Sequence, residues 1–391
     1  MATKTWSAWP DNPLWSWQVT RIIGLVDFGA ANFTEVMEVV QRITPRDEES
    51  WHREWYRMGE LVEAMARRGG AADNRVSARN CYSRATQYFR LSHFFLSGKD
   101  PRKLPTLHRM QDCFEAAGWY FDPPLEVVAI PYEGRQLHGY FLPALDVTGP
   151  TPALIYLNGA DSLSEEVYFT AGRAAQEFGY NFLMFNAPGV GLTLYELGLP
   201  TRPDCERFVA PVVDYMERRP EVDRGRIGLI GESFAGYLVP RAAAMEKRIR
   251  AVAVWSPIYK WNIEPLWQVA PAAFKDHLMH LFGAGDEQDL FAKTRAYTLE
   301  GVAERLECPS YLLQGSEDWI IHRPIEAALR IAREAKGPAT VRIVERDEGV
   351  GGVCHCQKDN LHVAHLETFN WFAETLGRPP KRPLRAAGAR S

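Results

Sequence analysis

The stretch Gly231-Glu232-Ser233-Phe234-Ala235-Gly236 directly follows the apolar run 227–230 and precedes a helix-like run that begins at Tyr237. A serine between small residues, placed where a strand turns sharply into a helix, is typical of a nucleophile elbow. Small side chains are needed because the turn brings the two backbones together and holds the serine in a strained conformation. The pattern therefore predicts a strand, a tight turn and a helix, with Ser233 as a nucleophile.

Two later strand-end loops supply partners for this serine. The segment 309–314 has the pattern of a buried strand and ends in a loop that contains Asp318, the predicted acid. A second strand, 339–344, is followed by a glycine-rich loop that contains His355, the predicted general base. Serine, then acid, then histidine is the chain order of an α/β-hydrolase. Nearby alternatives for the acid and the base are Glu317, Asp347, Glu348, His322, His362 and His365.

The predicted chemistry requires all three side chains. Serine is a poor nucleophile at its free pKa, so His355 must accept its proton while Asp318 fixes the imidazole tautomer. A further loop, Asn158-Gly159-Ala160-Asp161, follows the short apolar strand 153–157. The backbone N–H groups of Ala160 and Phe234 are therefore the predicted donors of an oxyanion hole.

The chain divides near residue 125. Residues 1–124 have helical periodicity and predict a helical lid or dimerisation domain, with Ser50 and Ser77 as candidate N-caps. Residues 125–376 alternate strand and helix, which predicts a catalytic domain of the α/β class: a mainly parallel sheet with helices on both faces and a helical insertion at about 257–300. The tail 377–391 is rich in proline and basic residues and is expected to be disordered.

Composition narrows the class of protein. The chain has 391 residues, a formal net charge of −4 and no long apolar stretch, which argues against nucleic-acid or membrane partners and for a cytoplasmic enzyme. Its six cysteines are scattered, as expected of reduced thiols. Cys354-His355-Cys356 could suggest a zinc site, but consecutive residues seldom chelate one ion. We expect no metal and no cofactor.

Aromatic residues gather in and near the insertion. They are Trp255, Tyr259, Trp261 and Trp267, with Trp319 beside the predicted acid. Loops at the carboxyl ends of parallel strands line the site in this fold, so the cluster predicts a flat, apolar or aromatic substrate. Packing within a lid explains the same residues equally well.

Several segments resemble one family. They are Asp47–Trp55, Ser77–Ala85, Asn158–Ser162, Asn186–Gly191 and Gly351–Asn360. Together they are similar to the 2,6-dihydroxypseudooxynicotine hydrolase family, which includes fungal hydrolases that shorten polyketides in pigment pathways. The similarity runs from about residue 10 to 376. Departures are Asn186 where the family commonly has Asp, Asn158 where it commonly has Gly, and Ala235 in the elbow.

This resemblance implies hydrolysis of a carbon–carbon bond next to a ketone, in a 1,3-diketone or an acyl-phenol of a secondary-metabolite or catabolic pathway. It carries the nucleophile, acid and base to Ser233, Asp318 and His355, makes Glu264 a substrate-binding candidate by position, and implies a homodimer. An esterase, a thioesterase, an acyltransferase or a cyclising enzyme would use the same groups, because the leaving group belongs to the substrate. A non-catalytic binding protein is the remaining alternative.

Overall fold

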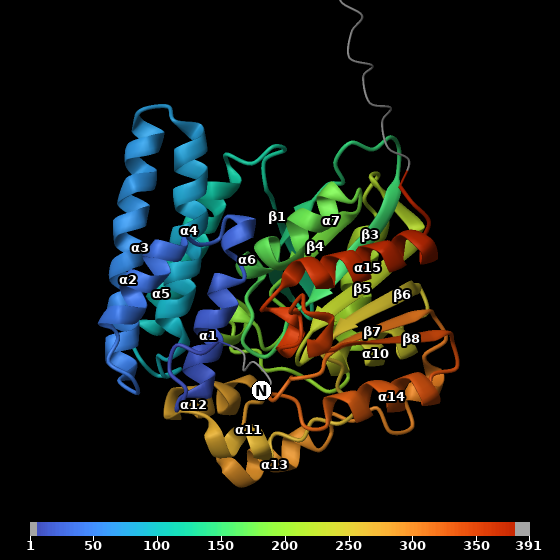
Figure 1. Cartoon of the computed structure of the whole chain (residues 1–391). Coiled ribbons are helices and arrows are strands. Elements are labelled where there is room, and N and C mark those ends of the chain that lie inside the picture. The colour runs from blue at the N-terminus through green and yellow to red at the C-terminus, as the bar shows by residue number, and fades with distance from the viewer. Residues whose placement is uncertain (1–5, 380–391) are drawn as a thin grey trace, which may run out of the picture.

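One sheet organises the chain (Figure 1), and it has eight strands. The structure is a computed structural model that describes residues 6–379. The strands are β1 (Glu126–Tyr132), β2 (Arg135–Leu142), β3 (Thr151–Leu157), β4 (Asn181–Phe185), β5 (Val222–Glu232), β6 (Ile249–Trp255), β7 (Ser310–Gly315) and β8 (Ala339–Val344), in the order β1-β2-β4-β3-β5-β6-β7-β8. Strands β3 to β8 are parallel and β2 pairs antiparallel with β1 and β4, which confirms the predicted mainly parallel sheet.

The sequence of each strand matches its place in the sheet. Every residue of β3 and β4 is buried, whereas β1, at the edge, alternates between exposed and buried positions. Central strands of a parallel sheet are covered on both faces and are therefore apolar throughout. The parallel strands end at one edge, where loops from β3, β5, β6 and β7 meet.

Helices cover the sheet and form the insertion. Those that follow the strands are α6 (Ser164–Val167), α7 (Arg173–Glu177), α8 (Gly191–Tyr195), α9 (Glu206–Glu217), α10 (Ala235–Met245), α14 (Pro324–Glu334) and α15 (Leu361–Thr375). The insertion consists of α11 (Glu264–Val269), α12 (Ala272–Leu281) and α13 (Glu287–Thr294), the gold and orange helices at the bottom of Figure 1. No helix within residues 6–379 is long and apolar enough to cross a membrane.

Five helices precede the sheet: α1 (Pro13–Ile23), α2 (Phe33–Arg42), α3 (Glu48–Ala71), α4 (Arg75–Phe94) and α5 (Lys103–Gly118). Trp15, Trp51 and Trp55 are almost fully buried among them, and burial of each large side chain contributes about 1.5–3 kcal/mol. The predicted caps Ser50 and Ser77 are wrong. Asp47 and Asn74 cap α3 and α4, because their side-chain oxygens reach the free backbone amides of Ser50 and Ser77.

The predicted division near residue 125 falls in the connection between α5 and β1. It stays a prediction, because nothing in the structure tests whether either part folds alone. Of the tail 377–391, residues 380–391 lie outside the described part of the chain.

Candidate active site

The elbow around Ser233 joins β5 to α10. Ser233 has φ of +56°, a left-handed conformation that is strained for a residue with a side chain. A Cβ atom at Gly236 would lie 2.5 Å from the carbonyl oxygen of Ser256, so only glycine fits there. The turn holds Ser233 partly exposed between two buried neighbours, Glu232 and Phe234.

Asp318 and His355 are brought into direct contact from two loops that are 37 residues apart. The Nδ1 atom of His355 lies 2.8 Å from Oδ2 of Asp318, and both residues are buried. Oδ1 of Asp318 accepts hydrogen bonds from the backbone amides of Ile320 and Ile321, at 3.1 and 3.2 Å, and Oδ2 accepts one from Nε2 of Gln314 at 3.2 Å. The carboxylate is therefore fixed and fully engaged.

The two side chains shift each other's pKa. Burial alone would raise the pKa of Asp318, but the charge of His355 and the hydrogen bonds hold it below its usual range. Burial alone would lower the pKa of His355, but the Asp318 carboxylate raises it well above its usual value. The pair therefore favours the charged state of both groups, which is the arrangement that makes imidazole a stronger base.

Two contacts tie the elbow to the loop that contains His355. Lys358 and Glu232 form a buried ion pair, with 2.7 Å between Nζ and Oε2. Ser256, at the end of β6, accepts a hydrogen bond from the backbone amide of Cys356 at 2.8 Å. Because Glu232 precedes the serine and Lys358 follows the histidine by three positions, this ion pair fixes the two loops relative to each other.

The loop after β3 packs directly on the serine. A Cβ atom at Gly159 would lie 3.0 Å from Cβ of Ser233. The carbonyl oxygen of Ala160 accepts a hydrogen bond from Nε2 of His277 in α12 at 2.7 Å, and Nδ1 of His277 accepts one from the Tyr195 hydroxyl at 2.7 Å. Burial lowers the pKa of His277 to about 4, so the ring is neutral at pH 7 and this pattern fixes its tautomer.

Helix α1 forms the opposite wall of the site. The Trp17 ring lies 5.8 Å from the His355 ring, centroid to centroid. Gln18 donates a hydrogen bond from Nε2 to Asp161 at 3.2 Å, and Arg21 forms ion pairs with Asp161, at 2.8 Å, and with Glu166. The pKa of Arg21 is raised because these two carboxylates outweigh the effect of burial. Sequence reasoning missed all of these contacts, since no local pattern connects residues 140 or more positions apart.

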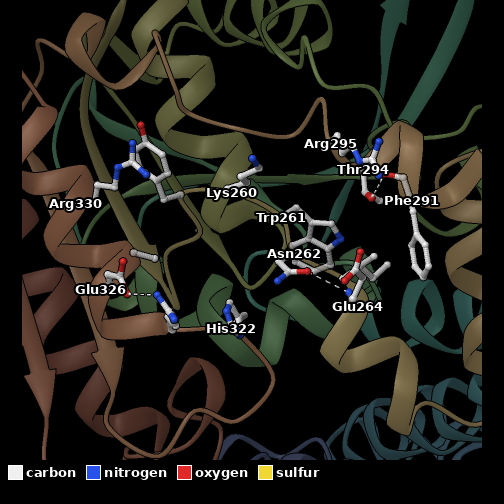
Figure 2. Close-up of a pocket in the computed structure, with 14 residues that line it drawn as sticks. Lys260, Trp261, Asn262, Glu264, Phe291, Thr294, Arg295, His322, Glu326 and Arg330 are labelled. Atoms are coloured by element: carbon white, nitrogen blue, oxygen red, sulfur yellow. Dashed lines mark hydrogen bonds and ion pairs between the residues drawn. The ribbon is translucent and has the colours of Figure 1, made fainter.

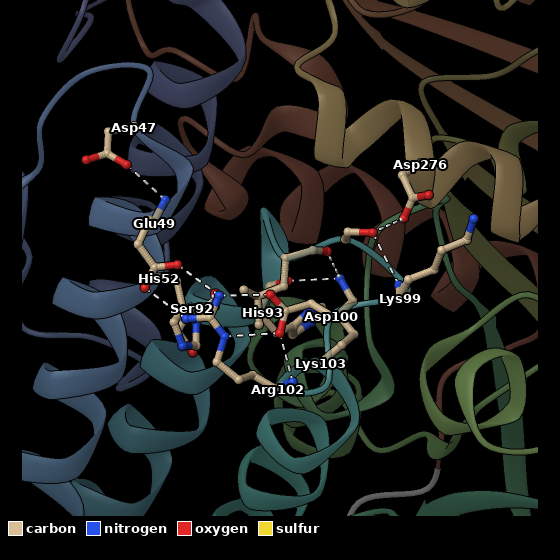
Figure 3. A network of polar contacts seen from close by, with 12 residues as sticks. Asp47, Glu49, His52, Ser92, His93, Lys99, Asp100, Arg102, Lys103 and Asp276 are labelled. Carbon is tan, nitrogen blue, oxygen red and sulfur yellow. Dashed lines mark hydrogen bonds and ion pairs between the residues drawn. The ribbon is translucent and has the colours of Figure 1, made fainter.

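A network of polar contacts surrounds the C-terminal end of α4 (Figure 3). Lys103 is buried and donates hydrogen bonds from Nζ to the carbonyl oxygens of His93 and Leu96, at 2.9 and 3.0 Å. Burial lowers its pKa to about 7. Arg102, beside it, pairs with Asp100 and Glu49 on the surface. Lys103 thus adds a donor to two carbonyl groups at the end of the helix and fixes the position of His93.

The aromatic candidates are distributed over different environments. Trp255 is fully buried and donates a hydrogen bond to Thr368, so packing accounts for it, and Trp319 is exposed. Tyr259, Trp261 and Glu264 line an open pocket whose lining does not include Ser233, Asp318 or His355 (Figure 2). Trp261 links that pocket to the elbow, because its ring packs edge-on against Phe234 with 5.1 Å between centroids.

The sheet, the elbow and the loops at its carboxyl edge define the class of α/β hydrolases. A family model described as "Esterase FrsA-like" matches residues 32–300, and the chain belongs to this FrsA-like family. It is 34% identical over 291 residues to the α/β hydrolase gkaG of Penicillium citrinum, covering 71% of this chain and 67% of that protein. It is 35% identical over 273 residues to the α/β hydrolase xenA of Xenoacremonium sinensis, covering 67% and 64%.

A solved structure shows the same fold over nearly the whole chain. The crystal structure of 2,6-dihydroxy-pseudo-oxynicotine hydrolase superposes with a TM-score of 0.76 at 20% identity, covering 93% of this chain and 99% of that one. Because this match includes the N-terminal helices, the combination of a helical region with an α/β-hydrolase sheet is common to both. The matches to the two fungal relatives span about two thirds of their length.

Proposed function

We propose that this hydrolase cleaves a carbon–carbon bond next to a ketone, with Ser233 as nucleophile, His355 as general base and Asp318 as the orienting acid. The observation that carries the proposal is the 2.8 Å contact between His355 and Asp318 at the same sheet edge as the strained, partly exposed Ser233. We assign the Ala160 and Phe234 amides to the oxyanion hole. Neither amide donates a hydrogen bond within residues 6–379, so both are free for a substrate oxygen.

The reaction follows from these positions. The Oγ atom of Ser233 adds to the ketone carbon while Nε2 of His355 takes its proton, and the two amides hold the oxyanion that forms. Collapse of this intermediate breaks the carbon–carbon bond, and His355 returns the proton to the departing carbanion. Water then adds to the acyl-serine through the same base, which releases a carboxylic acid and restores Ser233.

The leaving carbanion limits the substrate class. It can depart only if a second carbonyl or an electron-poor ring delocalises its charge, which favours 1,3-diketones and acyl-phenols. The similarity to fungal α/β hydrolases supports a substrate of a secondary-metabolite or catabolic pathway. The aromatic side chains of Trp261 and Trp17 near the site suit a flat substrate.

Ester hydrolysis is the second candidate, and the family description favours it, since it names an esterase. The two candidates share every step up to the bond that breaks. Only the substrate separates them.

The test compares the wild-type protein with Ser233→Ala on aromatic 1,3-diketones, acyl-phenols and matched esters in ¹⁸O-labelled water, with products identified by mass spectrometry. We expect ketone cleavage with one labelled oxygen in the acid, a loss of activity on the order of 10⁶-fold in Ser233→Ala, and normal activity in Ser77→Ala. Cleavage of esters alone would assign the protein to the second candidate. Full activity of Ser233→Ala would rule out both.

A further inference from the structure

Helix α4 presents three buried polar residues at three-residue intervals: Gln87, Arg90 and His93. Much of their hydrogen-bonding capacity is unused. Within residues 6–379, Nε2 of Gln87, both terminal nitrogens of Arg90 and both ring nitrogens of His93 have no partner. Buried polar groups in proteins are almost always hydrogen-bonded, so three adjacent exceptions on one helix require an explanation.

Arg90 is the most costly of the three. Its guanidinium is fully buried, and burial lowers its pKa to about 10, which still leaves it charged at neutral pH. Only Nε is engaged: it donates to Oε1 of Gln87 at 3.0 Å and lies 3.8 Å from Oε1 of Glu166. The two terminal nitrogens therefore form a free edge with parallel N–H groups, the geometry that binds a two-oxygen anion.

Arg21 shows what a purely structural arginine looks like in the same cluster. Its Nε and one terminal nitrogen donate to Glu166, and the other donates to Asp161 at 2.8 Å. Glu166 is thus already occupied by Arg21. Arg90 has no second carboxylate within reach among the described residues, and a structural role would have supplied one.

One of the three residues, His93, lies beside the loop that contains Ala160. His93 lines a small cavity of about 20 Å³ together with Ala160, Asp161 and His277, whereas Gln87 and Arg90 lie behind it on the same helix. Arg90 is close enough to His93 that its charge helps to lower the pKa of that ring, after burial and the charge of Lys103, so His93 is neutral and can donate one hydrogen bond. On the facing helix, Oε1 of Gln18 is also buried without a partner, while its Nε2 contacts Asp161.

We propose that Gln87, Arg90 and His93 form a binding subsite for a planar, delocalised oxyanion of the substrate, such as a carboxylate or the enolate of a 1,3-dicarbonyl compound. Its place in catalysis rests on the function proposed above, because the anion would be held beside the loop that contains Ala160. The subsite binds and orients the substrate and takes no part in proton transfer. It would select acidic substrates over neutral ones of the same shape.

The experiment measures binding by calorimetry to the full-length Ser233→Ala protein, so that turnover is not needed. The probes are 3-benzoylpropionate, a carboxylate; 5-phenylcyclohexane-1,3-dione, an enolate at neutral pH; and 4-oxo-4-phenylbutanamide, the uncharged amide of the first. We expect at least one anion to bind about 10- to 100-fold more tightly than the amide, as for hydrogen bonds to a charged group. A preference for one anion identifies the source of the oxyanion.

Arg90→Gln in the same background should abolish this preference and change amide binding by less than about threefold. Arg84→Gln is the control, since Arg84 is on the same helix but is paired with Glu35. If Arg90→Gln does not fold, His93→Phe decides, because the His93 ring has no hydrogen-bond partner within residues 6–379 to lose; it should fold and weaken anion binding about tenfold.

Equal binding of the amide and both anions, or no binding of any probe, would overturn the subsite. Retention of the preference in Arg90→Gln would do the same. These results are independent of the proposed reaction: an esterase that prefers acidic substrates would keep the subsite, and a carbon–carbon hydrolase without the preference would lose only the subsite.

Discussion

Asp318 and Arg90 are both buried charges at the site, and they differ in how the surrounding chain satisfies them. The Asp318 carboxylate accepts hydrogen bonds from two backbone amides, a glutamine amide and the His355 ring, whereas the Arg90 guanidinium uses one of its three nitrogens within residues 6–379. The wall formed by the sheet edge thus pairs its buried charge with groups of the protein itself. The wall formed by the helical region has unused donors at Arg90 and His93 among the described residues, and we propose that the first wall performs the chemistry and the second selects the substrate.

Asp318→Asn should give the largest effect and tests the first half of this comparison. An amide in this position favours the wrong imidazole tautomer, so we expect kcat to fall on the order of 10⁴-fold. Steady-state kinetics on the best substrate from the panel checks this. Glu317→Gln is the matched control, because Glu317 is adjacent but its carboxylate pairs with Arg346. An equal loss in both variants would mean that the acid is misassigned.

Arg21→Met should cost about 3–5 kcal/mol of unfolding free energy, because it leaves the buried Glu166 and the half-buried Asp161 without their principal partner. Urea denaturation followed by circular dichroism measures the loss. Arg42→Met removes an ion pair between two half-exposed side chains and should have no measurable effect. Equal stability of both variants would show that the helical wall does not depend on this cluster.

His277→Phe should lower kcat about 10- to 100-fold, because it removes the hydrogen bond to the Ala160 carbonyl and lets the loop that contains Ala160 shift. His277→Gln can still donate to that carbonyl and should recover part of the rate, which separates positioning from simple packing. His280→Phe, one turn further along α12, should be nearly neutral. If His277→Gln is no better than His277→Phe, the hydrogen bond to Ala160 does not position the loop.

The smallest of the expected effects concerns how kcat/KM depends on pH near neutral pH. His355 must be neutral to accept a proton, and Asp318 raises its pKa, so kcat/KM should fall tenfold per pH unit as pH drops below this raised value. We expect the acid limb to lie above pH 6.5. Asp318→Asn should move that limb to lower pH. An acid limb well below 6.5 in the wild-type protein would contradict the assignment of His355 as base.

The two walls also differ in how far the sequence predicted them. Ser233 follows from a local strand, turn and helix, and Asp318 and His355 each stand just beyond a strand, where the fold places reacting groups. Trp255 occupies an equivalent strand end, yet it is buried against Thr368, because alternate residues of a strand face opposite sides of the sheet.

The helical wall has no such local signal. Arg21 and Asp161 are 140 residues apart, and no local pattern connects Arg90 with Glu166 either. A helix that carries buried arginines looks like any amphipathic helix until its partner is placed against it. Even the helix starts were set by Asp47 and Asn74 rather than by the nearby serines, since both side chains reach amide groups that the serines cannot cap from inside the helix.

The Arg21 contacts limit how this chain can be shortened or recombined with its relatives. A shortened protein that began at residue 125 would retain the elbow and both strand-end loops, but Asp161 and the buried Glu166 would lose their ion pairs with Arg21. The loop that contains Asp161, which packs on Ser233, would then lose its ion pair with Arg21. The catalytic sheet therefore depends on the helical segment for the charges that neutralise its acids. Exchange of such segments between relatives should succeed only when Arg21 and its acidic partners are transferred together.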